Sequence, residues 1–190
     1  MTEKFLETLK GIADENFITY LQTRLEEALR YGDKSSAEIV GKELINQLEN
    51  IDKTELEEEL VEKINKEIEA VKEALNTERE DLGGTYLLSD ELIESLEEAY
   101  GEGEDVEWQF YITARLAEAS DVQDYPNVIF LTGKYFKELS YVYEDEPEIM
   151  EGLNKYPQII EEYKKETGDE APTYQTVAEY MFEHPEFIEE

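Results

Sequence analysis

The positions of proline place the strongest constraint on how this chain can fold. All five prolines of the 190 residues lie in the second half, at Pro126, Pro147, Pro157, Pro172 and Pro185. Residues 1–125 therefore contain no proline that must interrupt a helix. Apolar side chains recur through that stretch at spacings of three and four residues, as on one face of a helix. The sequence predicts a mainly α-helical protein whose N-terminal half is a bundle of several helices.

The longest expected helix in that half is also strongly acidic. Thr54 followed by Glu57 fits a capping box, in which the two side chains satisfy free backbone donors at a helix start. A coiled-coil-like seam follows, with apolar residues at Val61, Ile64, Ile68, Val71 and Leu75. The sequence predicts a helix at 54–81 that forms an antiparallel hairpin with the preceding helix, which Ser35 or Ser36 is expected to cap.

Gly83-Gly84 separates two expected regions of the chain. Residues 1–82 form the helical N-terminal region, and residues 85–190 form an acidic, Tyr-rich and more irregular helical region. An α+β arrangement stays open around residues 105–145, because apolar residues from Val106 to Ile112 alternate as in a strand. A helix is preferred there, since the stretch continues into the helix formers of residues 114–119 without a turn signal.

Proline followed by Glu or Gln occurs three times near the C-terminus, at Pro147, Pro157 and Pro185. Proline suits the first position of a helix, where its missing N–H has no helical partner to lose. Each of the three prolines therefore predicts the start of a helix.

The charge of the chain indicates what kind of partner it has. It contains 50 acidic and 17 basic residues, a formal net charge of -33. Solubility requires a net charge of only about 2 to 8 in a small domain, and self-repulsion at this density destabilises the compact state. Attraction to a strongly basic protein would offset that cost, and basic surfaces are typical of proteins that bind nucleic-acid phosphates. We expect a basic, nucleic-acid-binding partner such as a nuclease, with no direct binding of nucleic acid or membrane.

Acidic clusters and the tyrosines beside them are the candidate partner-binding residues. Two of the acidic clusters contain no basic residue. On the expected long helix, carboxylates three or four positions apart lie about 5 to 6 Å from one another, which is the scale of phosphate spacing on a nucleic-acid strand. A solvated helix face with i,i+4 ion pairs is the alternative for that helix. The candidates are Glu102, Glu104, Asp105 and Glu107; Glu144, Asp145, Glu146 and Glu148 with Tyr141 and Tyr143; and Glu58, Glu62, Glu69 and Glu73.

Catalytic chemistry finds little support in the sequence. There is no cysteine, the single histidine is His184, and no P-loop, dinucleotide-binding or EF-hand motif is present. We therefore predict no catalytic, cofactor-binding or metal-binding residue and no enzyme. One pattern is a formal exception: Glu55-x-x-Glu58 and Glu78-x-x-Asp81 match the Mg²⁺-binding pairs of all-α nucleotide pyrophosphohydrolases. Here both pairs are expected on one helix, about 35 Å apart, so this enzyme stays a lower alternative.

In charge and size the chain resembles the small acidic inhibitors that phages and mobile elements direct against restriction enzymes, CRISPR nucleases or DNA-repair enzymes. That resemblance implies a nucleic-acid mimic, an anti-CRISPR or anti-restriction protein acting in the cytoplasm of a bacterial host. Neither a signal peptide nor an apolar stretch of about 20 residues is expected from the sequence. An immunity protein or antitoxin that neutralises a basic toxin is the alternative, since it would show the same charge.

Overall fold

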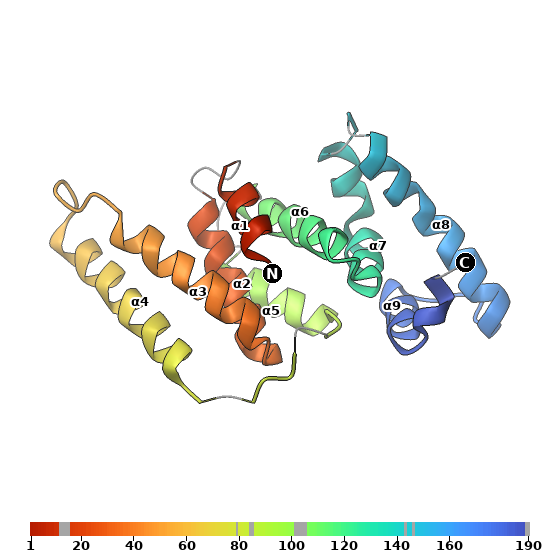
Figure 1. The fold of residues 1–190 in the computed structure, drawn as a ribbon. Coiled ribbons are helices and arrows are strands. Elements are labelled where there is room, and N and C mark those ends of the chain that lie inside the picture. Colours follow the sequence, from red (N-terminus) through yellow and green to blue (C-terminus); the bar gives the residue numbers. More distant parts are fainter. Residues whose placement is uncertain are drawn as a thin grey trace. The chain divides into compact units, whose positions relative to one another are not determined.

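The computed structural model describes residues 1–11, 16–78, 80–83, 86–100, 106–142, 144–145 and 147–188. Within these ranges the regular structure is entirely helical (Figure 1). This confirms the mainly α fold and the preference for a helix over a strand after residue 105. No helix of the described ranges is both long and apolar enough to cross a bilayer. The chain divides into two compact units: unit 1 comprises Met1–Tyr86 and Leu96–Tyr111, and unit 2 comprises Leu87–Ser95 and Ile112–Glu190.

Unit 1 is built around the pairing of three helices. Its elements are α1 (Glu3–Lys10), α2 (Phe17–Tyr31), α3 (Lys34–Glu49) and α4 (Glu58–Asn76), together with parts of α5 (Asp90–Tyr100) and α6 (Val106–Asp121). Helix α3 packs against both α2 and α4, and α3 and α4 form the expected antiparallel hairpin (Figure 1). Gly41 permits their close approach, because a Cβ there would lie 2.9 Å from a methyl group of Leu75.

The helix predicted at 54–81 is shorter at both ends than the sequence pattern suggested. Thr54 does not cap it: the backbone N–H and the hydroxyl of Thr54 both donate to Asp52 Oδ1, at 3.0 and 2.7 Å. This local turn competes with helix formation, so α4 begins at Glu58 with Glu57 as its N-cap. At the other end the backbone turns to an extended conformation at Thr77. The predicted boundaries were therefore wrong by several residues.

The predicted cap of the third helix was also misplaced. Asp33 caps α3, and its side chain accepts a hydrogen bond from the Ser36 backbone N–H at 3.0 Å. The preceding Gly32 adopts a left-handed conformation with φ of 67° that ends α2. Since an Asp side chain accepts from a helix N-terminus as readily as a Ser side chain does, α3 begins one residue before Ser35.

Unit 2 contains a second helical core. Its elements are α7 (Tyr125–Val142), α8 (Pro147–Thr167), α9 (Tyr174–Glu183) and the 3₁₀ helix η1 (Pro185–Ile188), with the remaining parts of α5 and α6. Helix α7 packs against α8 and α9, and η1 packs against α9. The core cluster comprises Ile129, Tyr163, Val177 and Met181. Pro147 and Pro185 begin helical elements as predicted, but Pro157 lies inside α8. Packing of Tyr156, Ile159 and Ile160 against this core holds α8 together on both sides of the proline.

Replacing Gly133 with alanine is expected to destabilise unit 2 by about 1 to 3 kcal/mol through overpacking. A Cβ at Gly133 on α7 would lie 2.5 Å from Tyr174 Cβ, an atom fixed to the backbone of α9, and 2.9 Å from the Tyr156 ring. Thermal denaturation followed by circular dichroism measures the effect. Gly152→Ala on α8 is the matched control, because a Cβ there meets open space. A Gly133→Ala protein as stable as the wild type would contradict the close approach of α7 and α9.

Candidate partner-binding surface

Helix α4 presents the four predicted carboxylates on one face, but half of them are already paired. Glu58, Glu62, Glu69 and Glu73 are all exposed. Lys66 forms an ion pair with Glu62 at 2.7 Å, and Lys72 forms one with Glu69 at 3.3 Å. Among the residues that the structure describes, Glu58 and Glu73 form no ion pair. The middle of α4 is therefore a solvated, partly neutralised face, and the two unpaired carboxylates lie near its two ends, Glu58 at the start and Glu73 close to the end.

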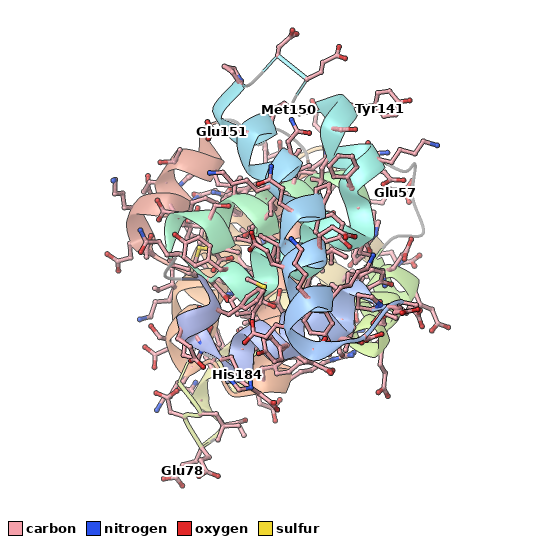
Figure 2. The ribbon with its side chains drawn as sticks, turned by 90° about the vertical axis from the view of Figure 1, so that its right-hand side faces the viewer. Glu57, Glu78, Tyr141, Met150, Glu151 and His184 are labelled. Carbon is pink, nitrogen blue, oxygen red and sulfur yellow. The ribbon has the colours of Figure 1, made fainter. Side chains whose placement is uncertain are left out.

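The acidic cluster at 144–148 occupies the connection between α7 and α8. Glu144 and Asp145 are exposed there, and neither forms an ion pair within the described part of the chain. Tyr141 is 69% exposed near the end of α7, with its ring pointing away from the neighbouring helices of unit 2 (Figure 2). An exposed aromatic ring therefore lies close in sequence to carboxylates that form no ion pair within the described residues, and their role in partner binding stays a prediction. Two candidates, Tyr143 and Glu146, lie outside the described residues, and the Glu148 side chain does too.

The other base-free cluster falls almost entirely outside the part of the chain that the structure describes. This applies to Glu102, Glu104 and Asp105. Glu107 lies in the first turn of α6, and its side chain is likewise outside the described residues. All four stay sequence-based predictions.

The sequence interpretation missed the acidic surface of α5. Glu91, Glu94, Glu97 and Glu98 are exposed on this helix, and none forms an ion pair within the described ranges. Asp90 at the start of α5 differs from these four: it forms an ion pair with Lys134 and accepts a hydrogen bond from the Tyr174 hydroxyl at 3.1 Å. A signal for this surface was present, because the 35 residues from 80 to 114 contain no Lys or Arg.

The four carboxylates of the pyrophosphohydrolase pattern are not brought together. Glu55 and Glu58 lie at the start of α4, whereas Glu78 and Asp81 follow its end. The 19 residues of α4 span about 28 Å at the helical rise per residue. Figure 2 shows Glu57 and Glu78 well separated at the two ends of this helix. Among the described residues, no group of three or more acidic or histidine side chains is arranged to hold a metal ion.

Unit 1 also contains a buried charged network that sequence analysis did not predict. Glu27 is fully buried on α2 and accepts hydrogen bonds from the hydroxyls of Tyr86 and Tyr111, at 2.5 and 2.6 Å. Arg24 donates to the Tyr86 oxygen at 3.1 Å and lies 3.7 Å from the Asp33 carboxylate. Since the charges lie inside the unit and are paired with one another, removal of one partner would leave another charge buried without compensation.

A small pocket lies beside this network, between the ends of α2 and α4. Its lining includes Gly32, Asp33, Leu75 and Glu80, and it has a volume of about 20 Å³. A space of this size accommodates about one water molecule.

Comparison with the models of known protein families, with characterised proteins and with solved structures found nothing similar to this chain. The candidate surface is therefore interpreted from its own residues.

The melting temperature is expected to rise when salt is increased from about 0.01 to 0.15 M, because the Debye length shortens from about 30 to about 8 Å and long-range repulsion is screened. The reason for this expectation is the net charge of -33. Part of that charge is carried by surface carboxylates that form no ion pair within the described residues. Scanning calorimetry in sodium chloride and in potassium chloride separates screening from the binding of a particular ion. A flat or falling curve would show that local pairing already balances the charge.

Proposed function

We propose that this protein is an inhibitor that binds a basic protein stoichiometrically and occupies the surface with which that protein binds nucleic acid. One observation carries the proposal: Glu91, Glu94, Glu97 and Glu98 of α5 and the pair Glu144-Asp145 are exposed and unpaired among the described residues. Carboxylates that only kept the chain soluble would gain from lysine partners, as Glu62 and Glu69 do on α4. Their unpaired state leaves them free to meet Lys and Arg of another protein.

The proposed mechanism has two stages. The negative field of the chain first steers it to a positive cleft, which raises the association rate. Exposed apolar and aromatic side chains such as Tyr141 then become buried and determine specificity. This mechanism involves binding without catalytic turnover. The target would then be a protein of the bacterial cytoplasm such as a restriction enzyme or a CRISPR nuclease. The protein would be an anti-restriction or anti-CRISPR inhibitor encoded by a phage.

A pull-down at low salt tests the proposal. Immobilised protein is incubated with bacterial lysate, and the captured proteins are identified by mass spectrometry. We expect a basic, nucleic-acid-binding protein that is released as salt increases, since the contacts are electrostatic. A captured toxin that does not bind nucleic acid would instead favour the immunity-protein alternative. Capture that is insensitive to salt would contradict the electrostatic mechanism.

A further inference from the structure

The tip of the α3–α4 hairpin carries one exposed and three half-buried apolar side chains. We call them the hairpin-tip patch: Leu60 is exposed, and Ile51, Leu56 and Val61 near it in the sequence are half-buried. Leu60 is 44% exposed, whereas Ile64 and Val71, on the same face of α4, are only 7% exposed. The apolar face that packs into unit 1 therefore continues to the start of α4 and becomes open to solvent there.

The backbone that supports this patch is held by local hydrogen bonds. The two bonds from Thr54 to Asp52 fix the turn before α4, and they hold the pKa of the Asp52 carboxyl below its ordinary value. Lys53 Nζ donates to Asn65 Oδ1 at 3.1 Å, which ties the turn to the second turn of α4. Because little ordering is needed on binding, such a surface loses less conformational entropy than a flexible loop would.

Acidic side chains stand between and beside the patch residues in the sequence, and we call them its rim. Glu55, Glu57, Glu58 and Glu59 are all exposed, and within the described ranges only Glu59 is paired, with Lys63 at 3.2 Å. The negative charge of this rim indicates which kind of surface can bind the patch. A second copy of the chain would bring the same charges into contact, and an anionic membrane surface would be repelled. A basic protein surface would be attracted and would complement the rim.

We infer that the hairpin-tip patch anchors the complex of the proposed function: Leu60 enters an apolar pocket of the basic partner, and Lys and Arg around that pocket meet the glutamates of the rim. An apolar centre within a polar rim is the usual anatomy of a protein interface, in which a few buried central residues dominate affinity. The inference rests on the proposed function. It adds a description of the partner's recognised surface, which is a basic cleft that contains an apolar pocket.

The test compares Leu60→Ser with the wild-type protein as bait in the same lysate, and then measures binding to the purified captured protein by surface plasmon resonance. We expect Kd to rise at least about tenfold, mainly through faster dissociation, with the salt dependence unchanged. Glu57→Gln with Glu58→Gln should instead slow association and reduce the salt dependence. Val122→Ser is the matched control, because Val122 is 47% exposed and lies in unit 2. Melting curves of all variants check that the fold is kept. Leu60→Ala repeats the test with a milder substitution at the same position.

The outcomes separate this inference from the proposed function. If Leu60→Ser and Leu60→Ala bind as tightly as the wild type while charge reversal at Glu144 and Asp145 weakens binding, the anchor lies elsewhere and the inference is wrong. If neither set of changes affects binding, both the inference and the electrostatic proposal are wrong. Faster dissociation of the Leu60 variants alone supports the anchor.

Discussion

Glu27→Ala is expected to lower the free energy of unfolding by about 3 to 5 kcal/mol, the cost of breaking a buried ion pair by removing one partner. Glu27 is 0% exposed and accepts from the Tyr86 and Tyr111 hydroxyls, and its carboxylate lies 3.6 Å from Arg24. The substitution removes this shared acceptor and part of the counter-charge of a buried guanidinium. For a chain of this length the melting temperature should fall by about 6 to 20 °C.

Glu26→Ala is the matched control for that measurement. Glu26 is the preceding residue on α2, its side chain is 37% exposed, and it pairs with Arg30 at 2.9 Å. A surface pair of this type contributes only about 0.3 to 0.5 kcal/mol. Equal melting temperatures for the Glu26 and Glu27 variants would show that the buried network does not hold unit 1 together.

Reversing two charges at the α7–α8 connection, with Glu144→Lys and Asp145→Lys, is expected to slow association with the captured partner by about tenfold or more. Both carboxylates are exposed and form no ion pair within the described residues, so the reversal breaks no described ion pair. The slope of affinity against salt should also become shallower, because fewer charge-assisted contacts form. Stopped-flow or surface plasmon resonance kinetics at several salt concentrations measure both effects.

The control for the charge reversal is Glu161→Lys with Glu162→Lys. These adjacent residues are exposed on α8 in the same unit, and Glu161 already pairs with Lys164 at 2.8 Å. The two double variants change the net charge equally, so the comparison separates a local contact from total charge. Equal slowing by both would mean that only the total charge matters and that Glu144 and Asp145 make no specific contact.

Helix existence could be predicted from this sequence, and so could the helix starts at Pro147 and Pro185, but the start of α3 and both ends of α4 could not. Apolar spacing located the body of α4, because Ile64, Ile68 and Val71 must share one face of any helix that contains them. The short connection at Ile51 to Lys53 then predicted the hairpin with α3. The ends depend on side chains that bond to nearby backbone, such as Asp33 at the start of α3 and Asp52 before α4. Several residues in each connection could play that part, so spacing does not select one.

The candidate surface was predictable only in part for a related reason. Composition identified the base-free cluster at Glu144 and Asp145, and the same criterion applied to residues 80–114 would have found α5. Burial of charge was not predictable, since the partners of Glu27 lie far along the chain, 59 residues away at Tyr86 and 84 at Tyr111. From the sequence, Glu27 is one of two adjacent glutamates on a helix that also carries Arg24 and Arg30.

Competition with nucleic acid tests the central claim most directly. A labelled oligonucleotide is bound to the captured partner, this protein is titrated in, and fluorescence anisotropy follows release of the oligonucleotide. If this protein occupies the nucleic-acid site, it displaces the oligonucleotide completely at the stoichiometry of the complex. Its apparent affinity for the partner then weakens in proportion to the oligonucleotide concentration. A ternary complex, in which the partner binds this protein and keeps its nucleic acid, would contradict the claim.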